Sequence, residues 1–303
     1  MVFYRVKGFR GSCRLTEVDS HWAVLSVNYF SGGSYPLVLD KHFIRKRVPN
    51  ISGESEHPRF QSASNPEFSG SQQLLDSELG LINYTTAIVS KFHKKMNLSQ
   101  LLVSDNDKMM EFGAGTGFLA SIMLDKFGIR PECVELDPEL ANLITVKGFT
   151  SFRFLKDSPR NYSHVYTSNV LEHIQDDNSI LRELYDSIIP GGFIGIYVPA
   201  HPLLYSEMDR QIGHVRRYTK SEIRTKVELA GFEIEILHYD DFLGFFASLF
   251  VKCIGYKKSS GLGSLASLVF YDKIIYPVSK VLDLIGFRYV LGKNLFMVAR
   301  KRP

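Results

Sequence analysis

Short apolar strands and amphipathic helices alternate along the chain after Lys108, and this order constrains the fold more than any other feature. Strands are expected at 109–112, 132–136, 151–155, 164–168 and 193–198, with helices at 118–127, 138–147 and 179–188 between them. A helix at 220–230 and strands at 232–239 and 294–300 follow. Strand–helix–strand units join parallel strands through right-handed crossovers. The order therefore predicts an α/β, doubly wound, mostly parallel seven-stranded sheet.

Composition divides the chain into two expected parts. Residues 51–73 are rich in Ser, Glu, Pro and Asn and poor in aliphatic side chains, which is typical of a linker or mobile loop. We therefore expect an N-terminal extension and linker over 1–73, partly mobile, and a main domain over 74–303 that begins with a helix. Short strands are expected in HWAVLSVNYF and YPLVL, but the first fifty residues show no recognisable chemistry.

The charge distribution argues against a nucleic-acid binder. The chain has 36 Lys and Arg against 32 Asp and Glu, and nine of these bases and five of these acids lie in the first sixty residues, so the main domain is close to neutral. A protein that binds nucleic acid by phosphate neutralisation gathers its bases on one face. Three widely spaced cysteines predict neither a zinc site nor a disulfide framework and favour a reducing, cytoplasmic setting. No signal peptide or membrane-spanning segment is expected.

The strongest local motif is MMEFGAGTGFLASIML, in which an acid and glycines alternate between a strand and a helix. Glycine at 113, 115 and 117 lets the backbone turn sharply and approach a ligand. Glu111, at the strand end, can bind a cationic ligand group through charge-assisted hydrogen bonds. Phe118 occupies a position where the dinucleotide fingerprint needs a small residue, which argues against a nicotinamide-dependent oxidoreductase. Taken alone, the motif is also compatible with a mere tight turn.

A second acid follows at the end of the next strand. Glu135 occupies the position at which an acid in nucleotide-binding α/β folds accepts the ribose hydroxyls. Asp137 precedes Pro138 at the start of the next helix, and a helix N-cap is as good an interpretation of Asp137 as ligand contact.

With these features, the SNVLEHI segment and the PGG turn, the sequence resembles the class I S-adenosylmethionine-dependent methyltransferases over 74–239 and 292–301. The resemblance implies their Rossmann-like fold and S-adenosylmethionine as cofactor. It implies that Glu111 and the backbone of the glycine turn hold the methionine moiety, that Glu135 holds the ribose, and that Asp157 meets the adenine. The cofactor residues expected on this basis are Glu111, Gly113, Ala114, Gly115, Gly117, Glu135, Leu136, Asp157, Asn169 and Leu171.

The segment VPAHPLLYSEMDRQIGHVRRYTKSE should lie at the carboxyl edge of the sheet, where open α/β folds bind substrate. We expect His214 to take a proton from the acceptor, and we expect the Asp209 carboxylate to orient the His214 ring. An anchoring role in a surface loop remains open for Arg217 and Tyr218, and a packing role for His173. No metal ligand is expected. The expected acceptor residues are His173, His201, Tyr205, Arg217 and Tyr218.

Residues 240–291 form an apolar helical insertion before the last strand. They contain ten aromatic residues and four acids, and simpler family members have only a short connection here. We expect these helices to form an apolar cap on the acceptor side, while an extra helical layer, a dimer interface and a surface that contacts a membrane remain open.

The sequence as a whole predicts a methyltransferase that uses S-adenosylmethionine to methylate a hydroxyl or amine. The expected acceptor is small, or linked to lipid or glycan, and peripheral membrane contact or a homodimer would involve 240–291. The alternative is a non-catalytic S-adenosylmethionine-binding or scaffold protein with the same fold.

Overall fold

The computed structural model describes residues 78–99, 108–254 and 265–303, together with the backbone of 3–4, 11–17, 22–29 and 34–40. The chain forms two compact units, Met1–Asn65 and Pro66–Pro303, which are treated separately below. The linker expected over 51–73 lies outside the described residues.

The first unit contains a four-stranded antiparallel sheet in the order β1-β2-β3-β4. Its strands are β1 (Phe3–Tyr4), β2 (Gly11–Glu17), β3 (Trp22–Tyr29) and β4 (Ser34–Asp40). The strands expected in HWAVLSVNYF and YPLVL correspond to β3 and β4.

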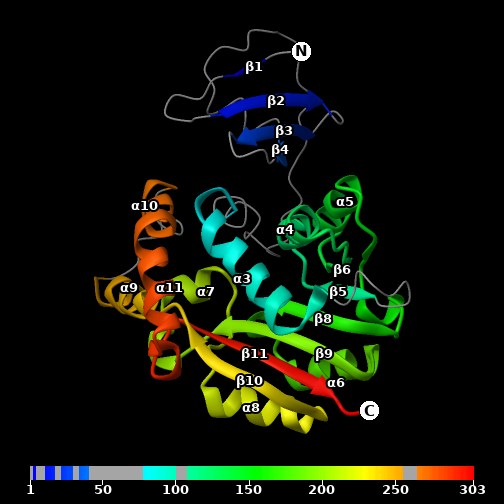
Figure 1. The fold of residues 1–303 in the computed structure, drawn as a ribbon, viewed down its shortest axis with the longest axis vertical. Coiled ribbons are helices and arrows are strands. Elements are labelled where there is room, and N and C mark those ends of the chain that lie inside the picture. Colours follow the sequence, from blue (N-terminus) through cyan, green and yellow to red (C-terminus); the bar gives the residue numbers. More distant parts are fainter. Residues whose placement is uncertain are drawn as a thin grey trace, which may run out of the picture. The chain divides into compact units, whose positions relative to one another are not determined.

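The second unit is built on a seven-stranded sheet in the order β10-β11-β9-β8-β5-β6-β7 (Figure 1). Five strands are parallel, whereas β11 lies antiparallel between β9 and β10. This confirms the doubly wound, mostly parallel sheet. The strands are β5 (Met109–Phe112), β6 (Glu132–Val134), β7 (Ser151–Phe152), β8 (Tyr162–Ser168), β9 (Ile188–Pro199), β10 (Phe232–Asp240) and β11 (Asn294–Lys301).

Helices cover both faces of this sheet, because the central strands are apolar on both sides. In β11, Leu295 and Met297 pack with α6 (Asp177–Ser187) and α8 (Lys220–Leu229), whereas Phe296 and Val298 pack with α3 (Ile82–Lys95) and α4 (Phe118–Phe127). Successive side chains of a strand point to opposite faces, so one strand supplies two cores. Helix α5 (Pro138–Val146) packs beside α4 through Ile144 and Ala120.

The PGG segment differs from its prediction as a turn before the fifth strand. β9 begins at Ile188, directly after α6, and contains Pro190–Gly192. Its pairing with β8 shifts register between Ile188 and Phe193, which indicates a bulge. Gly191 has φ +81°, a conformation that glycine tolerates and that fits a bulge inside a strand.

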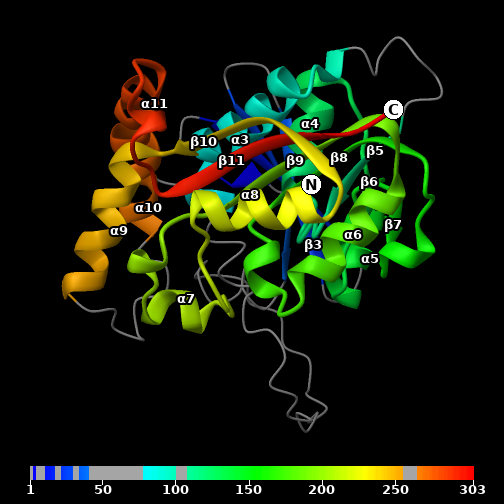
Figure 2. The same cartoon turned by 90° about the horizontal axis from the view of Figure 1, so that it is seen from below.

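The insertion is helical where it is described. It contains α9 (Phe242–Ile254), α10 (Leu265–Phe270), a π-helical turn (Tyr271–Ile275) and α11 (Tyr276–Leu284). The three α-helices gather beyond the end of the sheet where β10 ends and β11 begins (Figures 1 and 2). A search of the described residues finds no helix with the length and apolar character needed to cross a membrane.

Candidate active site

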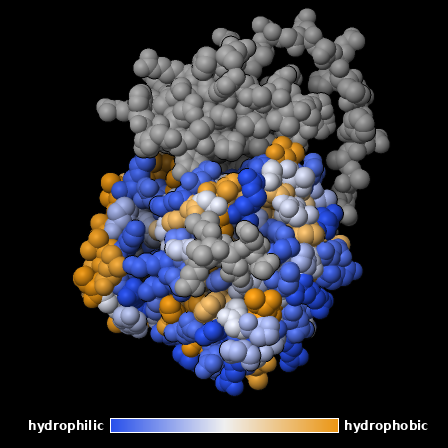
Figure 3. Space-filling view, turned by 45° about the vertical axis from the view of Figure 1, so that its right-hand side comes forward, coloured by the Kyte–Doolittle hydropathy of each residue, from blue (hydrophilic) through white to orange (hydrophobic). Residues whose placement is uncertain are grey.

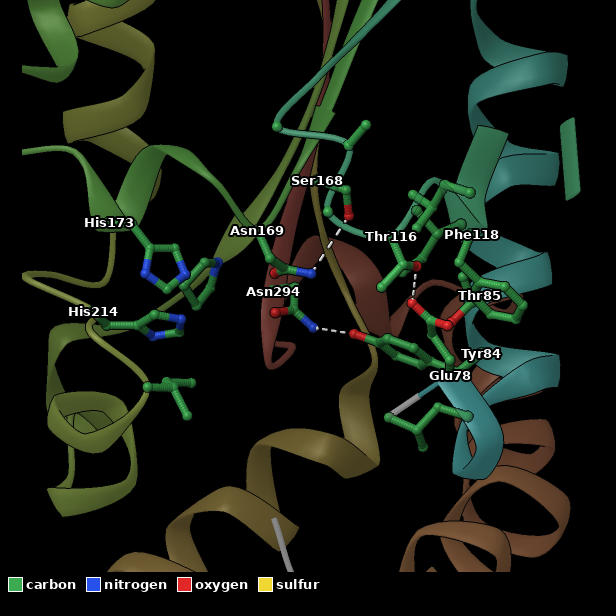
Figure 4. Close-up of a pocket in the computed structure, with 18 of the residues that line it drawn as sticks. Glu78, Tyr84, Thr85, Thr116, Phe118, Ser168, Asn169, His173, His214 and Asn294 are labelled. Carbon is green, nitrogen blue, oxygen red and sulfur yellow. Dashed lines mark hydrogen bonds between the residues drawn. The ribbon is translucent and has the colours of Figure 1, made fainter. Parts of the chain in front are cut away.

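A cavity of about 300 Å³ opens at the carboxyl edge of the parallel strands. This size is at the lower end of the range for small-molecule sites. Predicted site residues in its lining are Glu111, Gly113, Ala114, Gly115, Asn169, His173, His214 and Arg217. In Figure 4 His173 and His214 lie together at one end of the cavity, and Glu78, Thr116 and Phe118 lie at the other.

The glycine turn forms one wall of the cavity. Gly113 and Gly115 have φ +73° and +56°, in the left-handed region that favours glycine. The backbone N–H groups of Gly113 and Ala114 donate to the Val134 carbonyl at 2.8 and 3.1 Å, which fixes the turn against β6. A Cβ at position 113 would lie 2.4 Å from a methyl carbon of Val170. The turn therefore needs glycine at 113 for both conformation and space.

Glu111 supplies a buried carboxyl group at the end of β5. The Tyr166 hydroxyl donates to its Oε2 at 2.7 Å. Burial raises the pKa of Glu111 to about 8, although the Tyr166 hydrogen bond lowers it. A cationic ligand group beside this carboxylate would stabilise its charged form. The ammonium and sulfonium groups of the expected cofactor fit this requirement.

Glu135 lies beside the turn and is not among the residues that line the cavity. Its two carboxylate oxygens accept hydrogen bonds from the backbone N–H groups of Gly115, at 2.7 Å, and Asp137, at 2.9 Å. Asp137 itself is the N-cap of α5 and accepts from the N–H groups of Glu139 and Leu140. The N-cap interpretation of Asp137 is therefore the one that the structure shows.

At the opposite end of the cavity, Asp209 joins two basic side chains. Its Oδ1 accepts from His214 Nδ1 at 2.9 Å and from Arg217 Nε at 2.8 Å. Burial alone would raise the pKa of Asp209, but the hydrogen bond from His214 and the charge of Arg217 outweigh it and bring the pKa to about 2. An ionised carboxylate only accepts hydrogen bonds, so Nδ1 of His214 carries a proton, and in the neutral form of the imidazole the lone pair lies on Nε2.

Glu172 and His173 adjoin His214 from the segment after β8. Glu172 is fully buried, and its Oε1 lies 3.6 Å from His214 Nε2. Burial raises the pKa of Glu172 to about 8. The rings of His173 and His214 meet edge to face with centroids 4.7 Å apart. Burial, and then repulsion from His214, lower the pKa of His173 to about 4, so its imidazole is neutral near pH 7.

Four more predicted cofactor residues lie outside this lining. Gly117 is the N-cap of α4, and Leu171 is fully buried in the core beneath the sheet edge. Asp157 is exposed at the end of a 3-10 turn, and Leu136 is 65% exposed. Their roles toward the adenosine part of the cofactor stay predictions.

Three predicted acceptor residues also lie outside the lining. His201 stacks on an aromatic ring of β10 with centroids 4.8 Å apart. The Tyr205 hydroxyl donates to the His214 carbonyl at 2.7 Å, and the Tyr218 hydroxyl donates to Asp177 at 2.7 Å. These hydrogen bonds hold the loop that carries His214, which is the anchoring role left open for Tyr218.

The sequence interpretation did not identify several lining residues, notably Tyr84, Thr85, Lys293 and Asn294. Asn294 Nδ2 donates to the Tyr84 hydroxyl at 2.8 Å. β11 runs antiparallel to β9, so β11 begins at the edge of the sheet where β9 ends. The polar pair Lys293–Asn294 before an apolar strand could have indicated this position. Nothing in the spacing of α3 indicates that Tyr84 reaches the cavity.

Among the described residues of the insertion, none lines this cavity. Phe245 is buried with its ring 5.1 Å from that of His201, whereas Phe246 and Phe250 are 48% and 65% exposed. The predicted apolar cap over the acceptor is therefore not seen in the described part of the insertion. Of its aromatic residues, Phe245 packs beside His201, Tyr276 packs against Tyr84 of α3, and Phe246 and Phe250 are exposed.

The sheet order, the glycine turn and the acids at the strand ends define a nucleotide-cofactor enzyme of the Rossmann-like class. Residues 88–237 match the family model of a methyltransferase domain. The chain belongs to the class I S-adenosylmethionine-dependent methyltransferases, and its cofactor is S-adenosylmethionine.

Solved structures of the same kind are similar at low identity. An S-adenosylmethionine-dependent methyltransferase from Archaeoglobus fulgidus is 16% identical, with a TM-score of 0.47 over 72% of this chain and 94% of that one. One from Mesorhizobium loti is 13% identical, with a TM-score of 0.41 over 68% and 96%. A search of the curated proteins finds no match to this sequence.

Proposed function

We propose that the enzyme transfers the methyl group of S-adenosylmethionine to a hydroxyl or amine of a small acceptor, or of one linked to lipid or glycan. One observation carries this proposal. The cavity lined by Glu111 and the glycine turn is also lined by His214 and Arg217. A cofactor held by the turn and an acceptor held near His214 would therefore share one space.

The bound cofactor supplies an electrophilic methyl group on a sulfonium centre. The protein's part is to hold the acceptor atom in line with that methyl group and to leave it unprotonated. In the simplest form, His214 Nε2 takes the acceptor's proton while the Asp209 carboxylate holds Nδ1–H. Glu111 and the backbone of the turn hold the methionine part of the cofactor, and Glu135 holds the ribose.

The outer face of the insertion supports a lipid-linked acceptor. Figure 3 shows hydrophobic residues on the surface at the left, the side on which Figure 1 places α10. Exposed apolar side chains on the insertion helices include Phe246, Phe250, Phe270, Val278, Val281 and Leu284. The exposed charged side chains of the described insertion are the bases Lys252, Lys273 and Lys280. Exposed apolar residues and bases on the same helices suit an anionic lipid surface.

The acceptor is best identified by transfer of labelled methyl groups. Purified enzyme is incubated with methyl-labelled S-adenosylmethionine and a whole-cell extract, and the small-molecule, lipid, glycan, protein and RNA fractions are separated. We expect label in a small-molecule, lipid or glycan fraction. Label confined to protein or RNA, or no transfer to any fraction, would contradict the proposal.

A variant separates turnover from cofactor binding. His214→Ala should lower the rate of transfer by about a hundredfold or more, the range typical of a lost general base. Calorimetry should show nearly unchanged affinity for S-adenosylhomocysteine, because His214 lies at the opposite end of the cavity from the glycine turn. Full activity in this variant would leave His214 only a structural role.

A further inference from the structure

Three side chains with metal-binding atoms meet at the acceptor end of the cavity. Glu172, His173 and His214 each offer one ligand atom, and these atoms lie within 4.8 Å of one another. The backbone N–H of Val215 donates to the Glu172 carbonyl at 2.8 Å, which ties the two contributing loops together. The cluster is thus held in place by the fold, although His214 is far in the sequence from Glu172 and His173.

The Glu172 carboxyl group is the observation that points to a ligand. It is 0% exposed, and neither of its oxygens has a hydrogen-bond partner among the other described residues. A buried carboxylate without partners is costly, and a bound cation is one way to balance its charge. His214 Nε2 lies 3.6 Å from Glu172 Oε1, and because Nδ1 donates to Asp209, Nε2 is the atom that the neutral imidazole can offer to a metal ion.

The surroundings have the arrangement found around protein metal ions. Histidine ligands usually donate their other ring N–H to a carboxylate or a backbone carbonyl. His214 has such a partner in Asp209, and His173 hydrogen-bonds with the backbone of Gly213. Ligand atoms around a tetrahedral ion at about 2.1 Å are roughly 3.4 Å apart, so small side-chain rotations would bring these three atoms to bonding positions.

We propose that Glu172, His173 and His214 bind a divalent first-row transition-metal ion beside the acceptor. Two imidazoles and one carboxylate suit Zn²⁺, Mn²⁺, Fe²⁺ or Co²⁺ better than Mg²⁺ or Ca²⁺, which prefer oxygen ligands alone. His173 and His214 line the cavity, so the open coordination positions face the acceptor.

The ion would change how the acceptor loses its proton, and this part of the inference rests on the proposed function. A metal-bound Nε2 of His214 cannot accept a proton. An acceptor hydroxyl bound to the ion becomes more acidic, its O–H bond breaks and the proton passes to water. The oxygen then takes the methyl group from the sulfonium, and S-adenosylhomocysteine leaves.

Binding is tested with Co²⁺ on the full chain after chelation and dialysis, with visible absorption as the readout. We expect one Co²⁺ per chain, competed by Zn²⁺, and at least tenfold weaker binding in Glu172→Gln and in His214→Gln. His93→Gln, at a histidine that does not line the cavity, should bind as the unaltered chain does. Circular dichroism checks that each variant is folded.

No Co²⁺ binding by the unaltered chain, or equal affinity in the two cluster variants, would overturn the inference. Activity is the second readout. Methyl transfer should fall after chelation and return with Mn²⁺, Co²⁺ or Zn²⁺, whereas full transfer in excess chelator would overturn the catalytic part and return the proton to His214. Metal binding with no methyl transfer under any condition would contradict the proposed function and leave the metal site standing.

Discussion

Folding moves the pKa values of single buried carboxyl groups away from those of an unfolded chain. Glu111 is 3% exposed, and its pKa of about 8 lies well above the ordinary value of 4.5. Burial, the main cause, disfavours the charged form. Asp209 is equally buried but has basic partners, and its pKa is near 2. These two buried carboxyl groups therefore differ in charge because their partners differ.

Glu111→Gln should remove a pH dependence of stability. A carboxyl group whose pKa is raised on folding binds its proton more tightly in the native state, so its contribution is present below about pH 4.5 and is lost as the pH rises toward 8. Between about pH 5.5 and pH 8, the stability of the unaltered chain should fall relative to Glu111→Gln by roughly 2–3 kcal/mol.

Urea unfolding of both proteins at the two pH values, without cofactor, measures this difference. The same variant should bind S-adenosylhomocysteine more weakly at pH 8, where the carboxylate is available. A stability difference that does not change with pH would show that Glu111 is not buried as an acid.

At the scale of elements, the turn between β5 and α4 depends on space as well as on conformation. Gly113→Ala places a Cβ 2.4 Å from the Val170 side chain in a residue with φ +73°. We expect a loss of roughly 2–5 kcal/mol in stability and little remaining cofactor binding, measured by thermal unfolding and calorimetry.

Gly128→Ala is the matched control for this turn. Gly128 has φ +71° at the end of α4, and an added Cβ would meet nothing within 4 Å. This variant should cost only about 1–2 kcal/mol, for the backbone conformation, and should bind the cofactor normally. Equal effects of the two alanines would show that the contact with Val170 does not matter.

A side chain of the insertion, Asp272, caps the start of α3. Asp272, in the π-helical turn, accepts hydrogen bonds from the N–H groups of Asn83 and Tyr84 at 3.0 and 2.8 Å, and Tyr84 lines the cavity. Asp272→Ala should lower stability by about 1–3 kcal/mol, because two backbone donors at the start of α3, of which that of Tyr84 is buried, lose their partner. Lys273→Ala, at the exposed neighbour, should change it by less than about 0.5 kcal/mol. Chemical denaturation of the two variants compares them, and similar values would contradict the capping role.

At the scale of the whole molecule, exposed apolar residues on the insertion predict association with anionic membranes. Phe250 and Leu284 are each 65% exposed. The full chain should sediment with vesicles of phosphatidylcholine and phosphatidylglycerol and less with phosphatidylcholine alone. The double variant Phe250→Ser with Leu284→Ser should bind at least about tenfold more weakly, because each apolar side chain contributes about 1.5–3 kcal/mol when buried.

Leu229→Ser is the control for this experiment, because Leu229 is 70% exposed on α8, outside the insertion. It should leave vesicle binding unchanged. If the unaltered chain does not bind vesicles but sediments as a dimer, and the double variant is a monomer, the apolar surface would instead be an interface with a second copy of the chain.

Local sequence by itself determined the elements and the cofactor turn. β5 and α4 have the bounds that the pattern predicts, because both depend on short-range rules: apolar periodicity and glycine at the points of left-handed backbone. The order of strands and helices was enough to predict a parallel sheet, since crossover handedness leaves few alternatives.

Only the tertiary structure decided which side chains meet at the His214 end of the cavity. Glu172 and His214 come from different loops and approach because β8 and the segment after β9 end at one sheet edge. His201 is as prominent in the sequence as His214, yet it stacks on β10 and not in the cavity. Spacing along the chain does not encode distances between loops or the burial of a carboxyl group, and these are what distinguish a metal ligand or a base from a packing residue.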